Sequence, residues 1–457
     1  MNPTKIFNLL KNKSCSTKLK MILLLLFFLN TATIILAQEN VFTLDQSLKI
    51  GLENSKEIKI AKSKLLGSEA KVTEVSSQML PQLSFSAKYI RLSDVPPFQV
   101  DVPFLPKPIS IQETILNNYN LGVSVKQPLF TGFRLSSLKS SANMINLATE
   151  SEVLKTKNNI ALNIRAAYWN FYKVKKVVGL IDQNLISVKK HLEDAQNFYA
   201  NGMITKSDLL KLKVRYSNLK IKRIEAANNL SLARIAFNKA IGFNLNSETE
   251  IADAIVDTNL VEQKLSELIS EALKNRSELK SIHYQIEAGK EITSASRADW
   301  FPQVFLFGDY YYNRPNQRYL PLQDKFNDTW DVGVALNWKL WDWGNTSSKV
   351  DQAEQKVLQA ETTANLMKEG IELEVRKNYL NMISQKNKIY ASLTAMESAK
   401  EDYRITKNKF DQQLISASEF IDAESSLLEA KTNYTISQID FEITKTKLKK
   451  AVGEKIY

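Results

Sequence analysis

Side chains that could do chemistry are abundant in this sequence, but their spacing forms no catalytic pattern. The two histidines, His191 and His283, stand singly in helix-forming segments, and the one cysteine, Cys15, lies in a lysine-rich start. There is no phosphate-binding glycine loop, no His–Glu–His metal spacing and no Gly-x-Ser-x-Gly nucleophile motif. Acidic pairs three residues apart, such as Glu419 and Asp422, share a helix face, as on any solvated helix. We therefore expect no enzyme, no cofactor and no metal site.

Residues 1–37 have the pattern of a secretory signal. They carry five lysines and no acid, and the apolar run 21–29 precedes the ending Ile34-Ile-Leu-Ala37. We expect cleavage after Ala37; an uncleaved membrane anchor is the alternative, although the apolar run is short for a span. Without these five lysines the formal charge of +12 falls to +7. No basic cluster remains, so nucleic-acid binding is not expected.

Proline divides the remaining chain into two short windows and long helix-compatible stretches. After Pro3, every proline lies within 81–128 or 302–321. Because proline breaks a helix interior, the stretches outside these windows can form very long helices.

The two halves of the chain repeat one another. Tyr119–Val125 corresponds to Trp330–Leu336 at an offset of 211 residues, which still holds at Gly242 and Gly453. Helices packed in register would preserve such spacing, whereas loops would let it drift. We therefore expect a first repeat over 38–242, a linker over 243–264 and a second repeat over 265–457.

Each repeat is expected to contain a helix, a strand pair, a long helix, a turn and a returning helix. In the first repeat the ranges are 44–79, 82–92 with 119–130, 134–200 and 206–241. In the second they are 265–300, 303–313 with 329–341, 345–411 and 417–452. The two outer helices together match the long helix, which spans roughly 100 Å, so we expect them to stack end to end beside it.

The first long helix carries one apolar stripe at spacings of three and four residues. Its members are Ile160, Ile164, Tyr168, Phe171, Val174, Val178, Ile181 and Leu185. This stripe predicts the face that packs against other helices.

The predicted strands alternate apolar and polar residues, so each would have one apolar face. Only 303–313 is less regular, because Phe305 and Phe307 fall on its polar face. Ten to twelve residues are enough to cross a bilayer at a tilt. Tyr119, Trp330 and Trp338 near strand ends suit the aromatic girdles of a membrane barrel. A pair of soluble hairpins packed on a core is the alternative.

Four strands cannot seal themselves in lipid. The smallest membrane barrels have eight strands, and an open edge would leave backbone groups without hydrogen bonds. If the strands enter a membrane, several copies must share one barrel.

In plan and motifs, the chain resembles the TolC family of outer-membrane efflux proteins. The resemblance covers 43–453 and rests on the duplicated plan with Leu-Pro-Gln-Leu83, Gln127-Pro-Leu-Phe-Thr-Gly132 and the turn Phe198–Leu209. It implies a mainly α fold in which duplicated helix hairpins form an α-barrel. It also implies a homotrimer whose subunits each give four strands to one twelve-stranded barrel in the outer membrane.

The resemblance further implies a passive exit duct that extends into the periplasm. A periplasmic adaptor and an inner-membrane pump, proton-driven (RND type) or ATP-driven (ABC type), would dock there. The alternative is a periplasmic coiled-coil adaptor or scaffold without a barrel. Adaptors carry one helical hairpin, however, whereas this chain repeats its plan twice.

A gate is implied at the turns 200–206 and 411–417, which would form the periplasmic mouth. Acids just after the second turn line the closed entrance in the family, and Glu419 and Asp422 match them. Three copies would gather six carboxylates around one axis, a ring that attracts cations. A solvated acidic face is the alternative.

Asp208 matches an acid that latches the closed state in the family, through an aromatic residue and an arginine at the second turn. Phe410 matches the aromatic residue but lacks a hydroxyl, and Ile415 stands where the arginine would be. Closure is then expected from packing or from Lys206 and Lys211.

The apolar residues of both turns are expected to be exposed and to meet the adaptor. Packing between neighbouring turns is the alternative. They are Gly202, Met203, Ile204, Leu414 and Ile415.

Overall fold

The computed structural model describes residues 40–457 except 97, 102, 105, 107, 113–114, 255 and 257–262. The expected signal, 1–37, lies outside the described residues. Two compact units divide the chain, and each takes segments from both halves of the sequence. Unit 1 comprises the described parts of Met1–Glu53, Asn163–Thr258 and Lys388–Glu442, and unit 2 those of Asn54–Leu162, Asn259–Asn387 and Ile443–Tyr457.

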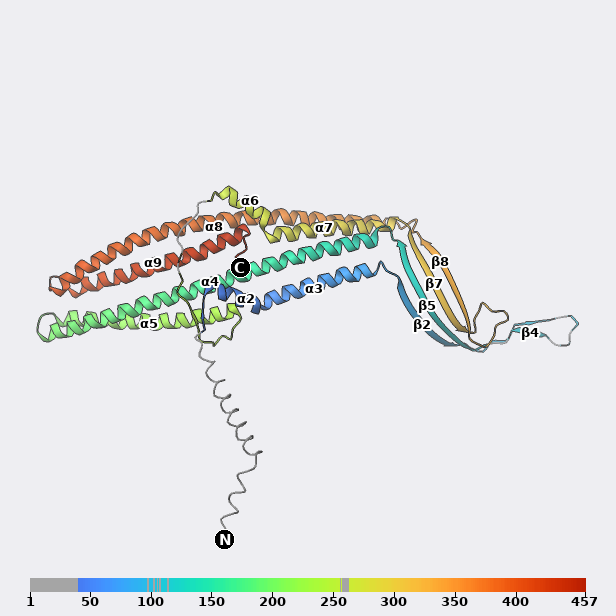
Figure 1. Ribbon diagram of the computed structural model, residues 1–457, viewed down its shortest axis with the longest axis horizontal. Coiled ribbons are helices and arrows are strands. Elements are labelled where there is room, and N and C mark those ends of the chain that lie inside the picture. The colour runs from blue at the N-terminus through green and yellow to red at the C-terminus, as the bar shows by residue number, and fades with distance from the viewer. Residues whose placement is uncertain are drawn as a thin grey trace, which may run out of the picture. The chain divides into compact units, whose positions relative to one another are not determined.

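The long and returning helices begin and end where the sequence predicted (Figure 1). They are α4 (Arg134–Ala200), α5 (Lys206–Ile241), α8 (Asn345–Asp411) and α9 (Ala417–Val452). Every member of the predicted α4 stripe is buried or half-buried. The stripe therefore marks the packed face, as expected from its helical spacing.

The prediction of one continuous helix at the start of each repeat is wrong, because both helices are broken. Segment 44–79 forms α2 (Leu44–Asn54) and α3 (Lys56–Ser77). Segment 265–300 forms α6 (Leu265–Asn275), α7 (Ser277–Arg297) and the 3₁₀ turn η2 (Ala298–Trp300).

The breaks at Ser55 and Arg276 fall at equivalent positions of the two repeats. Both residues are extended, with φ/ψ of −61°/120° and −60°/123°. The Ser55 hydroxyl accepts the Ile58 N–H at 3.2 Å and caps α3. The buried Arg276 guanidinium donates to the Ala451 carbonyl at 3.1 Å and pairs with Glu374 at 2.9 Å. Polar side chains thus stabilise a non-helical residue in the middle of each predicted helix.

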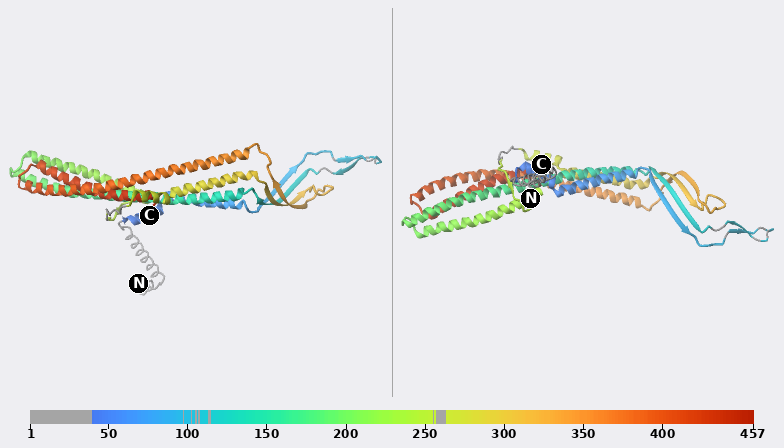
Figure 2. Two further views of the ribbon diagram at one scale, coloured as in Figure 1. Left: turned by 90° about the horizontal axis from the view of Figure 1, so that it is seen from above. Right: turned by 60° about the horizontal axis from the view of Figure 1, so that its bottom comes forward.

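Within unit 2, helices pack in one layer in the order α3–α4–α7–α8 (Figures 1 and 2). The Ser68 hydroxyl of α3 donates to the Asn146 side chain of α4 at 2.6 Å, and the Ser141 hydroxyl of α4 donates to the Ala288 carbonyl of α7 at 3.0 Å. Ile282 and Ile286 of α7 pack with Ala364 of α8. Helices α3 and α8 are therefore the two edges of the layer.

The strands of unit 2 form an antiparallel sheet in the matching order β2–β5–β7–β8. Its strands are β2 (Gln82–Arg91), β5 (Asn117–Phe130), β7 (Gln303–Arg314) and β8 (Asn327–Asn337). Both predicted strand pairs are present, and β5 with β7 joins the two repeats. A small hairpin, β3 (Phe98–Val100) and β4 (Ile109–Gln112), lies between β2 and β5 in the chain.

Strand β8 ends four residues before the predicted boundary at 341. The chain leaves the sheet at Trp338, whose indole N–H donates to the Trp300 carbonyl at 3.2 Å. Trp338 therefore lies just beyond the strand and contacts the end of the preceding helical segment.

Both repeats turn from strand to long helix through two consecutive left-handed residues. These are Gly132 (φ 64°) with Phe133 (φ 67°), and Trp343 (φ 56°) with Gly344 (φ 79°). A Cβ at Gly132 would lie 2.5 Å from the Ala298 carbonyl oxygen, so only glycine fits there. Phe133 and Trp343 adopt a backbone conformation that is costly for a bulky residue, and their rings are exposed.

In unit 1, the described residues 243–254 of the segment expected as a linker are fixed to the helices. Strand β6 (Thr249–Ile251) pairs in parallel with β1 (Asn40–Phe42). The buried Tyr168 and Tyr172 hydroxyls of α4 donate to the Ala252 and Ala254 carbonyls at 3.1 and 3.0 Å. Among the described residues, no helix has both the length and the apolar character needed to cross a bilayer.

Candidate functional site

The two helix turns of unit 1 have the same backbone conformation. The Met203 N–H donates to the Phe198 carbonyl at 2.8 Å, and the Leu414 N–H donates to the Lys409 carbonyl at 2.9 Å. Each turn contains one left-handed residue, Gly202 (φ 73°) in the first and Gln413 (φ 61°) in the second. This is the Schellman arrangement, in which glycine is strongly preferred at the left-handed position.

Replacing Gln413 with glycine is expected to stabilise the protein by about 0.5–1 kcal/mol, because glycine adopts a left-handed conformation without steric cost. The midpoint of chemical unfolding would measure the change. Gly202→Ala is the matched variant and should destabilise. If Gln413→Gly instead lowered the free energy of unfolding, the Gln413 side chain would contribute more to stability than its left-handed backbone conformation costs.

The helices that follow the turns are capped alike. The Thr205 hydroxyl accepts the Asp208 N–H at 3.2 Å and lies 2.7 Å from the Asp208 carboxylate. The Ser416 hydroxyl accepts the Glu419 N–H at 3.3 Å and lies 3.4 Å from the Glu419 carboxylate. Such caps satisfy backbone donors at a helix start, so Asp208 and Glu419 each have a local structural partner.

The predicted gate residues occupy two different environments. Glu419 and Asp422 are exposed, and Asp208 is half-buried. Phe410 is buried and stacks on Phe420, with ring centroids 4.6 Å apart and an interplanar angle of 8°. One predicted closure residue links the two turn regions, because the Lys211 ammonium donates to the Ser418 hydroxyl at 2.8 Å. Among the described residues, no other predicted closure residue makes a hydrogen bond between the turn regions.

The five predicted docking residues are not all exposed. Met203 and Leu414 are 49% and 68% exposed, and Gly202 is also exposed. Ile204 and Ile415 are instead half-buried against a core cluster that includes Phe410 and Phe420. Met203 and Leu414, adjacent to the left-handed residues, therefore present the accessible apolar surface of the turns.

A buried polar cluster behind the turns was missed by the sequence analysis, which treated His191 as an ordinary helix residue. Its members come from four helices: Ser187 and His191 of α4, Arg215 of α5, Tyr403 of α8 and Glu424 of α9. The His191 Nε2 lies 3.1 Å from the Ser187 hydroxyl, 3.4 Å from the Tyr403 hydroxyl and 3.8 Å from the Glu424 carboxylate. We call these five residues the buried polar cluster.

Burial shifts the ionisation of this cluster. Glu424 is 2% exposed, and within the described structure neither of its carboxylate oxygens has a hydrogen-bond partner. Loss of hydration raises the pKa of Glu424 to about 7, partly offset by the positive charge of Arg215. Burial also lowers the pKa of His191. Both side chains are thus favoured in their neutral forms.

In unit 2, the sheet has one continuous apolar face. The register places Phe85, Val123, Tyr310 and Trp330 side by side across the four strands. The other apolar members of this face are Leu83, Ala87, Tyr89, Tyr119, Leu121, Val125, Val304, Leu306, Tyr312, Val332, Val334 and Leu336. Most are exposed, up to 73% for Leu83, and an apolar face this large marks a contact with lipid or protein.

The opposite face explains the irregular third strand. Phe305 and Phe307 of β7 lie on this face with Ser84, Ser124 and Asp309, as predicted. The Lys126 ammonium lies 4.2 Å from the centre of the Phe305 ring, and the Phe307 ring covers Gly333, whose missing Cβ leaves room for it. The two phenylalanines thus have partners on a polar face.

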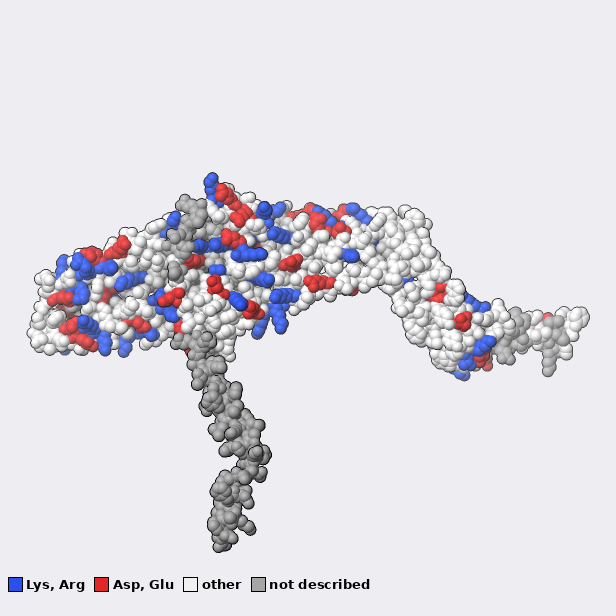
Figure 3. Space-filling view, viewed as in Figure 1, with Lys and Arg blue, Asp and Glu red and all other residues white. Residues whose placement is uncertain are grey.

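The predicted girdle residues are partly exposed aromatics, and more lie at the junction between helices and sheet. Tyr119 packs on Tyr89 with ring centroids 4.9 Å apart, while Trp330 and Trp338 are 69% and 54% exposed. The sequence analysis missed the exposed aromatic residues Phe133, Trp300, Phe301, Trp341 and Trp343. On the face shown in Figure 3, this junction carries few charged side chains.

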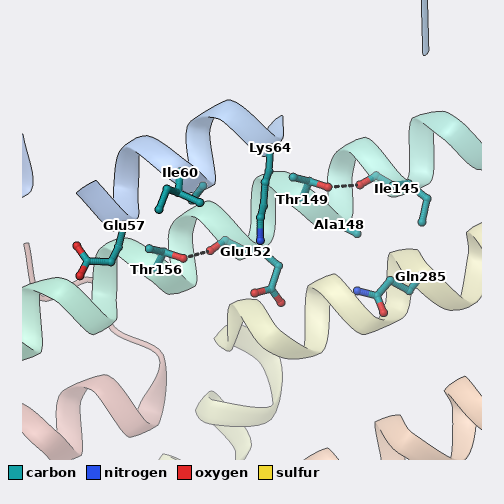
Figure 4. Close-up of a pocket in the computed structure, with 10 residues that line it drawn as sticks. Glu57, Ile60, Lys64, Ile145, Ala148, Thr149, Glu152, Thr156 and Gln285 are labelled. Atoms are coloured by element: carbon teal, nitrogen blue, oxygen red, sulfur yellow. Dashed lines mark hydrogen bonds between the residues drawn. The ribbon is translucent and has the colours of Figure 1, made fainter. Parts of the chain in front are cut away.

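A groove of about 450 Å³ lies between α3, α4 and α7 of unit 2 (Figure 4). Its lining includes Ile60 and Lys64 of α3 and Ile145 of α4. The hydroxyls of Thr149 and Thr156 donate to carbonyls of their own helix, at 2.8 Å each. The groove therefore offers a mixed apolar and charged surface rather than a reactive group.

Known proteins match this chain over most of its length. The profile of the outer membrane efflux protein family matches residues 48–243 and 268–454. The chain is 20% identical to the outer membrane protein TolC of Vibrio cholerae over 384 residues, 84% of each protein. It is 17% identical to the outer membrane efflux protein BepC of Brucella suis over 326 residues, 69% of this chain and 70% of that protein.

Solved structures agree on the fold. The crystal structure of the outer membrane protein VceC of Vibrio cholerae superposes with a TM-score of 0.75 at 17% identity. The alignment covers 91% of this chain and 97% of VceC. The helix-rich architecture is thus that of outer membrane efflux channels. The chain belongs to the outer membrane efflux protein family.

Proposed function

We propose that this protein is one subunit of an outer-membrane exit duct, which passively conducts substrates from an inner-membrane pump and a periplasmic adaptor to the cell exterior. Its localisation is the outer membrane, with a periplasmic extension. The mature chain would begin after a signal at 1–37 and consist of two repeats, 38–242 and 265–457, joined by 243–264. Transport energy would come from the pump, because a duct of this kind needs no catalytic site.

The main support for this proposal is that, in unit 2, each edge of the helix layer continues directly into an open edge of the sheet. Helix α3 leads into β2 at one edge, and β8 leads into α8 at the other. A second copy placed edge to edge would pair β8 with β2 and pack α8 against α3. Three copies joined in this way would close a twelve-stranded barrel in the outer membrane and leave no strand edge in lipid.

The exposed edge of α8 is apolar, as a contact between two copies requires. Leu366, Leu373 and Leu380 of α8 recur every seven residues and are 64%, 68% and 62% exposed. On the opposite side of α8, Ala364, Ile371 and Val375 are buried. The leucine stripe has the spacing of a coiled-coil seam. The groove beside α3, with exposed Ile60, would receive it from a neighbouring copy.

The sheet supports the membrane part of the proposal. Its continuous apolar face would meet lipid, and the aromatic residues at both ends of the strands would lie at the two interfaces. Tyr119, Trp330 and Trp338 would belong to these aromatic girdles.

The periplasmic mouth is proposed at the two turns. Met203 and Leu414, with Gly202, Ile204 and Ile415, would dock the adaptor. Glu419 and Asp422 would line the entrance, with Asp208 and Phe410 supporting the turns from which they project. Since both acids are exposed next to one turn, three copies could bring them around a common axis.

A single-channel recording in planar lipid bilayers tests this function and the gate together. The purified mature protein is expected to conduct ions, and multivalent cations added on the mouth side are expected to block the current. Replacing both Glu419 and Asp422 with alanine should weaken that block by about tenfold or more, because two carboxylates per subunit leave the ring.

Glu429→Ala serves as the matched control, since this acid lies on the same helix farther from the turn. Unchanged block in the Glu419 and Asp422 double variant would remove these residues from the gate. Absence of any conductance would contradict the duct itself.

A further inference from the structure

The buried polar cluster joins the two helix hairpins of unit 1. Ser187, His191 and Arg215 belong to the hairpin α4–α5, while Tyr403 and Glu424 belong to the hairpin α8–α9. It is seated next to the apolar cluster behind the turns, where the His191 and Phe420 rings meet edge to face with centroids 4.8 Å apart. An ionisable carboxylate and an imidazole therefore face one another in a core, 3.8 Å apart.

We propose that Glu424 and His191 share a single proton, held on the carboxylate when the hairpins are packed and on the imidazole when water reaches them. In the step between the two arrangements, the Glu424 O–H bond breaks and a ring N–H bond forms on His191. No net proton is taken up or released. The packing of the hairpins would then depend less on pH than Glu424 alone would make it.

The geometry favours this assignment because neither group can be charged at low cost in the packed arrangement. Both Glu424 oxygens are buried without hydrogen bonds among the described residues, and so are Nε and Nη2 of Arg215. The imidazole Nε2 has only hydroxyls within hydrogen-bond distance, those of Ser187 and Tyr403. A buried ion without hydrogen bonds is strongly disfavoured relative to a hydrated one.

The surrounding charges come from each helix packed against the pair and largely cancel. They are Lys190 and Asp194 of α4, Arg215 of α5, and Lys407 and Asp411 of α8. Lys407 and Asp411 form an ion pair at 2.6 Å.

The sign of each contribution follows from which arrangement binds the proton more tightly. The pKa of Glu424 is about 7 when packed and 4.5 ordinarily. Between these values the packed arrangement keeps a proton that the exposed one releases, so Glu424 favours packing as the pH falls from 7 toward 4.5. The pKa of His191 is lowered from 6.5. Below 6.5 the exposed arrangement gains a proton that the packed one lacks, so His191 disfavours packing as the pH falls.

Hydrogen exchange of the full-length mature protein between pH 5 and pH 7 tests the proposal. The readout is the opening constant of peptides covering 417–427 of α9, after correction for the intrinsic pH dependence of exchange. In the wild type it should change less than in the His191→Gln variant, because the contributions of Glu424 and His191 have opposite signs.

The two single variants should show opposite slopes. In His191→Gln, opening should fall by about 40-fold from pH 7 to pH 5, the change that a carboxyl with these two pKa values produces. In Glu424→Gln, opening should rise over the same interval. The double variant should be flat, and Glu429→Gln, whose exposed carboxylate on the same helix is the matched control, should behave as the wild type. Slopes of the same sign in both single variants would overturn the proposal.

Histidine NMR of the wild type covers the case in which a variant does not fold. The chain has only two histidines, so His283→Gln assigns the His191 signals. A neutral His191 imidazole at pH 6 supports the proposal, and a protonated one overturns it.

The proposal rests on the proposed function only for its consequence, a mouth in which the opposite pH dependences of Glu424 and His191 offset one another. If the pH dependence of exchange differs from these expectations while the protein still conducts ions, proton sharing is refuted and the duct is not. If the protein does not conduct ions, the duct is refuted, and the pH dependence of exchange still tests proton sharing.

Discussion

Replacing Phe85 with arginine is expected to prevent stable insertion of the protein into the outer membrane. Phe85 is 71% exposed on the apolar face, in register with Val123. An arginine facing lipid costs up to about 2–4 kcal/mol per copy, depending on its depth in the bilayer, and three copies would share one barrel. Cell fractionation would measure the loss from the outer-membrane fraction.

The adjacent Ser86→Arg variant is the control. Ser86 is exposed in the same strand but points to the opposite face, beside Gly122. Its arginine would face the interior of the proposed barrel and should leave insertion intact. Equal losses for the two variants would mean that the apolar face does not meet lipid.

Replacing both Leu366 and Leu373 with glutamate is expected to dissociate the assembly into monomers in mild detergent. Burying a leucine contributes about 1.5–3 kcal/mol, so two per subunit supply a large part of each contact between copies. The glutamates would add buried unpaired carboxylates. Light scattering or native mass spectrometry would give the mass of the assembly.

Thr363→Glu with Asn365→Glu adds the same charge beside the stripe. Both residues are exposed on α8, and this double variant should retain the assembly. If the assembly of the Leu366 and Leu373 double variant also keeps its mass, α8 is not the edge at which copies meet.

The sequence predicted the long helices well because proline is confined to two windows and the repeat offset fixed the turns. It did not predict the breaks at Ser55 and Arg276. There a single extended residue depends on tertiary partners such as Ala451 and Glu374, which no local propensity reveals.

The exposed leucine stripe of α8, Leu366, Leu373 and Leu380, was not predicted from the sequence for a different reason. Apolar residues on two opposite sides of a helix, one toward α7 and one exposed, cancel any single apolar direction. A search for one stripe finds α4, whose packed face is dominant, and overlooks the second face of α8. The seven-residue recurrence from Leu366 to Leu380 was the available signal.

The buried polar cluster also left a trace in the sequence. Glu424 continues the buried series Ala417, Phe420 and Leu427 at spacings of three and four residues, and His191 falls between Val188 and Ala195 in the same way. A polar residue at an apolar-stripe position predicts burial. Its partners, however, lie on other helices and are visible only in the fold.

Membrane fractionation combined with mass measurement of the purified mature protein tests the central claim most directly. In lipid, a sheet with two open edges would have to pair with other copies to satisfy its backbone groups. We expect a detergent-stable assembly in the outer membrane, with three times the mass of the mature chain. A monomer that stays in solution without detergent would contradict it.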